Sequence, residues 1–163
     1  ASQVALLFLI NYLFNWLFAE KIGKLIGKFG ERSALTIEYC GLILVFIAYA
    51  FVENPYFAAG LYIVDHMFFA LAIAINTYFQ KIATPQDISS TSGVSFTINH
   101  IAAIFVPAVL GLIWIISSSA VFLIGASFAL CSLFLSQNIP SKPQIGNEVN
   151  WGRANKETRI DIS

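Results

Sequence analysis

The run Ile101-Ala-Ala-Ile-Phe-Val-Pro-Ala-Val-Leu110 is apolar at every position and shows no alternation of apolar and polar residues. A membrane-spanning strand needs such an alternation over about 10 residues, because one face meets lipid and the other faces a polar lumen. A continuous apolar run in hydrocarbon must close its backbone hydrogen bonds within itself, as a helix does. This stretch therefore predicts an all-α membrane protein, and the rest of the chain follows the same pattern.

Five apolar stretches meet or approach the length of about 20 residues that a spanning helix needs. They are residues 4–19, 34–52, 56–79, 93–116 and 120–136. We expect residues 1–137 to form one transmembrane bundle of about five helices. The expected connections are residues 20–33, 53–55, 80–92 and 117–119. Residues 138–163 show no apolar periodicity, so we expect a polar, disordered tail.

The composition points to the same environment. Of the 163 residues, 58% are hydrophobic and 11% are charged, whereas a soluble domain has about 25% charged residues. One soluble core of this size cannot bury so many apolar side chains, so lipid is the expected partner. The formal net charge is zero, which gives no electrostatic case for nucleic acid. Cys40 and Cys131 stand alone in apolar runs, where we interpret them as small apolar fillers.

Basic residues occur in alternate connections. They are Lys21, Lys24, Lys28 and Arg32 in the first, Lys81 in the third, and Lys142, Arg153, Lys156 and Arg159 in the tail. Because basic loops remain on the cytoplasmic side, we expect a cytoplasmic carboxy terminus in a bacterial inner membrane or a plasma membrane. The first span would then enter from outside, and the chain does not begin with Met. We therefore expect further helices upstream.

The segment Gly23-Lys-Leu-Ile-Gly-Lys-Phe-Gly-Glu-Arg32 resembles the signature loop of the major facilitator superfamily, which reads roughly G-x-L-x-D-R-x-G-R-R. The matching residues are Gly23, Leu25, Lys28, Gly30 and Arg32. Gly27 replaces the family's aspartate, and Glu31 replaces a basic residue. Glycines would make a tight inner turn, and basic groups would hold it at the cytoplasmic surface. Residues 84–91, Asn99-His100 and residues 106–111 also look similar to this superfamily.

Members of this superfamily have two six-helix halves, each built from inverted three-helix repeats. The resemblance covers residues 4–136 and implies about helices eight to twelve, the carboxy-terminal part. The missing aspartate, the absence of Arg from residues 56–79 and the polar tail favour this part over helices two to six. The resemblance implies secondary active transport of a small solute with ion or proton coupling. The implied partners are the lipid bilayer, the missing amino-terminal half and the solute.

Polar groups inside hydrocarbon are costly and mark candidate substrate or proton pathways. Asp65 and His66 are adjacent in the third span, nearer its outer end. Adjacent residues on a helix diverge by about 100°, so at least one should face a central cavity. The other candidates are Asn11 and Asn15 on one face of the first span, Asn76 near the inner end of the third, and Asn99 and His100 in the fourth.

Several roles stay open for these residues. Asp65 could be a proton or cation coupling site, a substrate-orienting group, or part of a structural ion pair or hydrogen bond. His100 could bridge helices or contact substrate, whereas Asn11 and Asn15 favour interhelical hydrogen bonds. We expect Glu38, near the inner end of the second span, to reach the loop or to pair with a nearby Lys or Arg.

Pro107 in the fourth span removes a backbone donor and should kink the helix. Ala103, Pro107 and Gly111 follow at intervals of four residues, so they form a ridge of small residues that another helix can approach closely.

No H-E-x-x-H, G-x-S-x-G or G-x-x-x-x-G-K-[ST] motif occurs, so we expect no enzyme activity, no metal and no cofactor. An alternative function is a membrane scaffold or interaction subunit that transports nothing. Further hydrophobic spans encoded upstream of Ala1 would favour the transporter, whereas a start codon just before Ala1 would favour the subunit.

Overall fold

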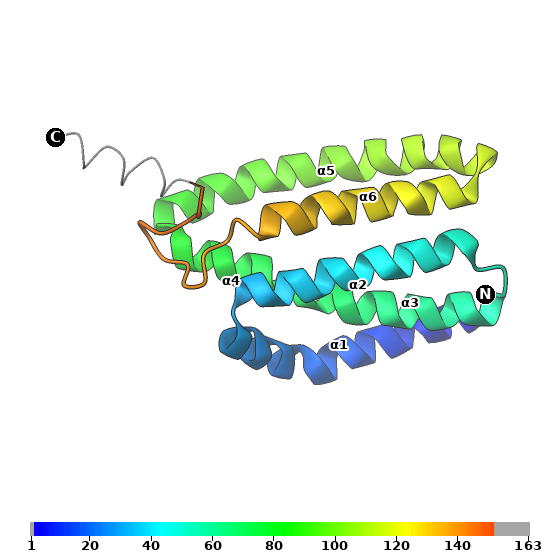
Figure 1. Cartoon of the computed structure of the whole chain (residues 1–163), viewed down its shortest axis with the longest axis horizontal. Coiled ribbons are helices and arrows are strands. Elements are labelled where there is room, and N and C mark those ends of the chain that lie inside the picture. The colour runs from blue at the N-terminus through cyan, green and yellow to red at the C-terminus, as the bar shows by residue number, and fades with distance from the viewer. Residues whose placement is uncertain (1, 152–163) are drawn as a thin grey trace.

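The structure is a computed structural model that describes residues 2–151, and at positions 2–4 and 14–15 it describes the backbone alone. The elements of this part of the chain are α1 (Ser2–Phe29), α2 (Glu31–Phe51), α3 (Pro55–Phe69), the 3-10 turn η1 (Ala70–Ala72), α4 (Ile73–Ile82), α5 (Pro85–Ile116) and α6 (Ser118–Ser136). These helices lie side by side along one long axis (Figure 1). The all-α prediction is therefore confirmed.

Four helical stretches are long and apolar enough to cross a membrane, and they are Glu31–Phe51, Pro55–Ile82, Pro85–Ile116 and Ser118–Ser136. α1 adds a fifth if its two parts, Ala5–Leu13 and Trp16–Phe29, which meet at a bend of 46°, count as one span. Many apolar side chains point outward, and Leu44, Ile104 and Phe134 are 69%, 70% and 70% exposed. Such a surface would aggregate in water, and it is compatible with a multi-pass integral membrane protein.

Local signals define where several helices begin. Gly30 separates α1 from α2 with a φ of 85°, which glycine adopts without steric cost. Asn54 caps α3, because its side-chain oxygen accepts a hydrogen bond from the backbone nitrogen of Tyr56 at 2.9 Å. Thr84 and Asp87 form a reciprocal capping box at the start of α5.

Two of the predicted connections are largely helical, which corrects the sequence-based boundaries. α1 continues through residues 20–29, and α5 already begins at Pro85. Gly23 and Gly27 therefore lie inside α1, and Gly30 alone makes the turn expected of the glycines. The physical reason is that apolarity indicates where hydrocarbon begins, whereas a helix continues until its backbone is capped or broken.

The third predicted span is interrupted in the structure. α3 ends at Phe69, η1 forms one 3-10 turn, and α4 continues to Ile82. No glycine or proline occurs between residues 61 and 84, so the usual helix breakers gave no signal of this turn. A 3-10 turn within a helix often marks a hinge.

α5 runs through Pro107 as a single α-helix, so the expected kink does not interrupt it. The small-residue ridge is exposed at Ala103, Pro107 and Gly111. A Cβ atom added at Gly111 would meet no atom within 4 Å. No described helix of this chain therefore packs closely on Gly111.

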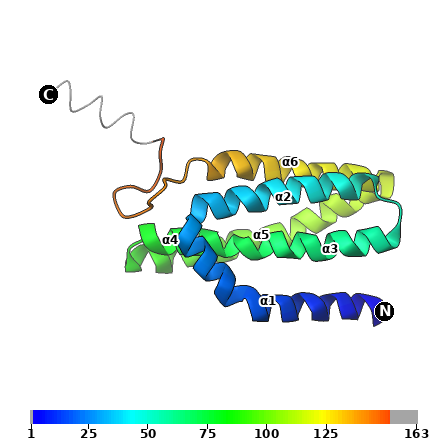
Figure 2. The same ribbon diagram turned by 60° about the horizontal axis from the view of Figure 1, so that its bottom comes forward.

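α2 is the central helix of the bundle and packs most extensively against α6 and then against α3 (Figure 2). Its buried residues are Glu31, Ala34, Leu35, Glu38, Gly41, Leu42, Val45 and Ala50. An apolar core joins α1, α2, α4 and the segment after α6, and it contains Ile26, Ala34, Leu35, Ala74 and Ile139. α5 differs, because it packs chiefly on α6 and has no buried residue.

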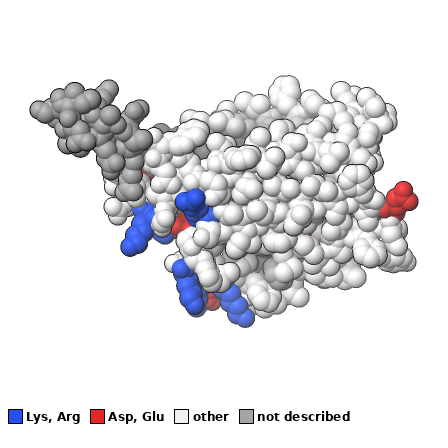
Figure 3. Space-filling model, in the orientation of Figure 1, with Lys and Arg blue, Asp and Glu red and all other residues white. Residues whose placement is uncertain are grey.

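The bundle has one basic end, which is the end where α1 meets α2 and where α4 meets α5. Lys and Arg side chains gather there on the visible face of the molecule (Figure 3). The α2–α3 connection at the opposite end contains the acidic residue Glu53. The alternation of basic connections along the sequence thus places the basic residues at one end of the bundle.

Residues 138–151 follow a defined course across the basic end, although composition predicted a disordered tail. The backbone nitrogen of Asn150 donates to the carbonyl oxygen of Asn138 at 2.9 Å. The Tyr78 hydroxyl donates to the carbonyl oxygen of Glu148 at 2.6 Å, which connects this segment to α4. Composition misses such order because hydrogen bonds to the backbone need no apolar periodicity. For residues 152–163, outside the described part, disorder stays a prediction.

Candidate functional site

Asp65 and His66 are adjacent on α3, and their side chains are 22% and 32% exposed. His66 Nδ1 lies 3.5 Å from Asp65 Oδ2 and 3.0 Å from the carbonyl oxygen of Tyr62. The rings of His66 and Tyr62 also contact each other, with centroids 4.3 Å apart. Because Nδ1 faces two oxygen acceptors, we assign the ring hydrogen to Nδ1. The two side chains therefore meet, although their positions on the helix diverge.

Asn11 on α1 lies at the level of this pair. α1 and α3 run in the same direction (Figures 1 and 2), and the Phe8 ring meets the Tyr62 ring edge-on with centroids 6.0 Å apart. Asn11 follows Phe8 by three residues, and Asp65 follows Tyr62 by three residues. Because both helices rise about 1.5 Å per residue, Asn11 and Asp65 lie at about the same height. Asn11 is 5% exposed. We call Asn11, Tyr62, Asp65 and His66 the polar cluster.

Two groups of the polar cluster have no hydrogen-bond partner among the described residues, namely Asn11 Nδ2 and the Tyr62 hydroxyl. An unsatisfied buried polar group costs about 1–3 kcal/mol, so native proteins keep few of them. A polar group on a solute or on a neighbouring helix could satisfy both. The cluster therefore has unused hydrogen-bonding capacity in an apolar environment.

The polar cluster lies near the middle of the bundle's long axis. Helices α3 and α4 together form the candidate span Pro55–Ile82. Asp65 lies a little beyond the centre of this span on the side away from the basic end.

The structure does not bring the other predicted pathway residues into the polar cluster. Asn99 and His100 are exposed on α5, and His100 Nδ1 lies 2.8 Å from the carbonyl oxygen of Phe96 in the same helix. His100 therefore forms no buried bridge between described helices. Asn76 is exposed on α4. Asn15 lies outside the residues whose side chains the structure describes.

A second polar network ties the helices together at the basic end. Lys81 Nζ lies 2.5 Å from Glu31 Oε1, and Glu31 is 2% exposed. Arg32 donates through Nε and Nη2 to Gln137 Oε1 at 3.3 and 3.2 Å. Gln137 Nε2 in turn donates to Thr36 Oγ1 at 2.9 Å. These contacts join the start of α2 to the ends of α4 and α6.

The residues of the signature segment have different positions in this network. Gly30 makes the turn before α2, and Arg32 takes part in the hydrogen bonds to α6. Gly23 and Lys28 lie on α1, and Lys28 Nζ lies 5.8 Å from the centroid of the Phe29 ring. The segment therefore acts as a structural junction at the basic end.

Glu38 is a buried acid that the sequence-based reasoning misplaced. It is 2% exposed, and its Oε2 has no hydrogen-bond partner among the described residues. Glu38 therefore does not reach toward the loop, and the ion pairs found in the described chain do not include it. Helical spacing could have revealed this position, because residue 38 continues the face formed by residues 31, 34, 35, 42 and 45.

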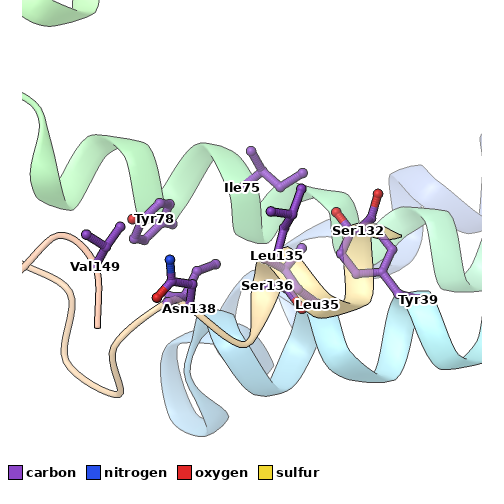
Figure 4. A pocket seen from close by; sticks show the side chains of 10 residues that line it. Leu35, Tyr39, Ile75, Tyr78, Ser132, Leu135, Ser136, Asn138 and Val149 are labelled. Atoms are coloured by element: carbon purple, nitrogen blue, oxygen red, sulfur yellow. The ribbon is translucent and has the colours of Figure 1, made fainter. Parts of the chain in front are cut away.

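A cavity of about 290 Å³ lies at the basic end among α2, α4, α6 and the segment that follows α6 (Figure 4). Its lining residues are Leu35, Tyr39, Ile75, Tyr78, Ser132, Leu135, Ser136, Asn138, Ile139 and Val149. No residue of the polar cluster lines it, so the two features are separate.

Comparison with protein-family models, with curated proteins and with solved structures found no match. Within the described part of the chain, no group of three or more His, Cys, Asp or Glu residues could hold a metal ion. The polar cluster can accept or release a proton through Asp65 or His66, and it can form hydrogen bonds through Asn11 and Tyr62. We therefore treat it as the candidate functional site.

Proposed function

We propose that this chain is the carboxy-terminal part, about helices eight to twelve, of a proton-coupled secondary transporter of the major facilitator type. It would move a small solute by alternating access. The observation that supports this function best is the polar cluster, where Asn11 and Tyr62 each keep a buried, unpartnered atom at the level of the Asp65–His66 pair. Such groups are costly in hydrocarbon, and transporters of this kind place substrate and ion sites near the bilayer midplane.

The uncovered surface of α5 gives further support. None of its residues is buried, and its small-residue ridge at Ala103, Pro107 and Gly111 has no close neighbour at Gly111. In the proposed transporter, helices of the missing amino-terminal half and lipid cover this surface. The order of the signature segment and the five apolar stretches is consistent with this assignment.

We place the basic end of the bundle, and with it the carboxy terminus, in the cytoplasm of a cell whose inner or plasma membrane contains the protein. The support is the positive-inside rule, since basic residues occupy the connections at one end. Asp65 would then lie slightly toward the outer side of the membrane midplane.

Asp65 is the residue that we assign to proton coupling. A carboxylate that takes up a proton when the cluster faces outward becomes neutral, and a neutral group can pass through the apolar closed state at lower cost. His66, with Nδ1 at 3.5 Å, forms an ion pair with Asp65 when its ring is protonated. Asn11 and Tyr62 would form hydrogen bonds to the solute.

The replacement Asp65→Asn in the complete protein tests this assignment. We expect it to abolish uptake driven by an imposed pH gradient and to spare exchange of labelled solute across vesicle membranes. The reason is that asparagine resembles the protonated carboxyl group in size and polarity but cannot take up or release a proton.

Glu53→Gln is the matched control, because it removes an acid from the exposed α2–α3 connection. It should leave both exchange and driven uptake intact. Undiminished pH-driven uptake by the Asp65→Asn protein would refute the role of Asp65. Failure of the complete protein to move any solute would support a scaffold or interaction subunit instead.

A further inference from the structure

Two acidic side chains of α2 are each 2% exposed, but only one of them has an ionic partner. Glu31 pairs with Lys81 at 2.5 Å. Glu38 Oε2, in contrast, has no hydrogen-bond partner among the described residues. Neither the polar cluster nor the network at the basic end uses Glu38, so its burial needs a separate explanation.

The register of α2 and α3 places Glu38 beside the 3-10 turn η1. The two helices are antiparallel, and a Cβ atom added at Gly41 would lie 2.5 Å from the ring of Phe68. Moving three residues toward the basic end from this contact leads to Glu38 on α2 and to Leu71 in η1. Since both helices rise by similar amounts per residue, Glu38 lies level with η1.

The described residues next to this level of α2 and η1 are apolar, and several of them are buried. Ala34 and Ala74 follow one turn closer to the basic end in the same register, and they are 5% and 0% exposed. Ala70, the first residue of η1, is 7% exposed. The seam between α2 and η1 therefore has small, buried side chains level with Glu38 and one turn closer to the basic end.

The charged and titratable groups near this level come from four elements. They are Lys21 and Lys24 on α1, Tyr39 on α2 itself, Tyr78 on α4 and Cys131 on α6. Both lysines are exposed, with Lys24 paired to Glu20 at 2.6 Å and Lys21 over the Phe18 ring at 5.2 Å. The Tyr78 hydroxyl donates to the carbonyl of Glu148, and Cys131 is exposed. No ion pair links a described cation to Glu38.

An ionised Glu38 carboxylate would keep a buried, unpartnered Oε2 and have no counter-charge, which is strongly unfavourable. A protonated acid is neutral and loses only hydrogen bonds. A metal cation would require several oxygen ligands. Among the described residues, no group of three or more His, Cys, Asp or Glu side chains could hold one. We propose that Glu38 is a proton-binding site and that its protonated form permits the close packing of α2 against η1.

Release of this proton would place a charge in the seam, so α2 and η1 would separate to admit water. η1 is the place where the span can bend, because 3-10 hydrogen bonds have poorer geometry than those of an α-helix. Such a bend would reorient α3, with Asp65 and His66, relative to α4. A role for this bend in transport rests on the proposed function. Proton binding by Glu38 requires no transport, so the two claims can fail separately.

Labelling with N,N′-dicyclohexylcarbodiimide, a hydrophobic reagent for protonated carboxylic acids, tests proton binding in membranes that contain the complete protein. Mass spectrometry of its peptides should find the adduct at Glu38 at mildly acidic pH. Labelling should then fall by about tenfold per pH unit once the group loses its proton. The variant Glu20→Gln, which changes an exposed acid, should show the same Glu38 labelling. Absence of the adduct at every pH, or labelling that does not change with pH, would overturn the proposal.

A second measurement tests the link to η1. A cysteine introduced as Leu71→Cys, with Cys40 and Cys131 replaced by serine, reports water in the seam through its reaction with a water-soluble thiol reagent. Its reactivity should rise with pH when Glu38 is present. It should stay low at every pH in the Glu38→Gln protein, whose neutral amide mimics the protonated acid. An equal rise in both proteins would disprove the link.

Discussion

At Gly41 the backbone of α2 comes very close to a side chain of α3. A Cβ atom at this position would lie 2.5 Å from three ring atoms of Phe68, which is too close for any stable contact. Gly125 on α6 provides a milder version of the same arrangement, because a Cβ there would lie 3.4 Å from the Phe46 ring. Glycine at position 41 therefore sets both the distance and the register between α2 and α3.

We expect Gly41→Ala to destabilise the protein by about 1–3 kcal/mol, because the Phe68 ring must move out of a packed interface. Thermal unfolding in detergent measures this loss. The matched control is Gly125→Ala, which should change stability much less, since its added methyl group makes an ordinary contact. Equal stability of the two variants would contradict the close approach of α2 and α3.

The buried polar side chains differ in how well they are satisfied. Glu31 has an ion pair with Lys81, and the half-buried Gln137 has four partners on two helices, so both contribute to a structural junction. Within the helices, Asn11, Tyr62 and Glu38 each keep an atom without a partner. Because such atoms lower stability, the unsatisfied set is the one for which a role beyond folding is expected.

The helices α2 and α4 are linked at the basic end by one ion pair whose acidic member is buried. We expect Lys81→Met to cost about 1–3 kcal/mol of stability, because it leaves the buried Glu31 carboxylate without its cation. Adding Glu31→Gln should restore most of this loss. Chemical denaturation of the single and double variants measures the coupling.

Lys24→Met provides the control for this prediction. It breaks the pair with Glu20, whose side chain, like that of Lys24, is more than 75% exposed, so its effect should be about 0–1 kcal/mol. Similar losses from Lys81→Met and Lys24→Met would mean that the Glu31 carboxylate is not held as the structure describes.

Apolarity predicted the five spanning stretches because lipid selects side chains continuously along a helix. It could not predict that α1 extends through residues 20–29, since polar residues also form helices until a residue such as Gly30 ends them. It also missed η1, which contains no glycine or proline that would signal a break in the α-helix. Local sequence does not predict such features where tertiary contacts override the helix propensity of the residues.

The candidate site was only partly predictable. Ionisable residues within apolar runs identified Asp65 and His66, and the structure brings Asn11 to their level. The structure keeps Asn99 and His100 apart from the polar cluster, because α5 packs chiefly on α6 and leaves these two side chains exposed. Glu38 was misread since distance from the span end suggested a loop contact, whereas its helical face directs it into the bundle.

Taken as a whole, the molecule combines a packed centre around α2 with an outer helix, α5, that has no buried residue. Exposed apolar side chains such as Ile104 and Phe105 on α5, 70% and 65% exposed, require lipid or further protein around them. The two ends also differ, with basic groups at one end and Glu53 at the other. By the positive-inside rule, such an asymmetry predicts the orientation of a membrane protein.

Single cysteines at the two ends of the bundle test that orientation, in a protein where Cys40 and Cys131 are replaced by serine. We expect Glu53→Cys to react with a membrane-impermeant maleimide added to intact cells, because the α2–α3 connection should lie outside. Gln86→Cys, at the exposed start of α5 beside the basic end, should react only after the cells are opened. Positive residues near the span ends resist translocation, so the basic end should remain inside. Reaction of Gln86→Cys in intact cells, with Glu53→Cys protected, would reverse the orientation and would put Asp65 on the cytoplasmic side of the midplane.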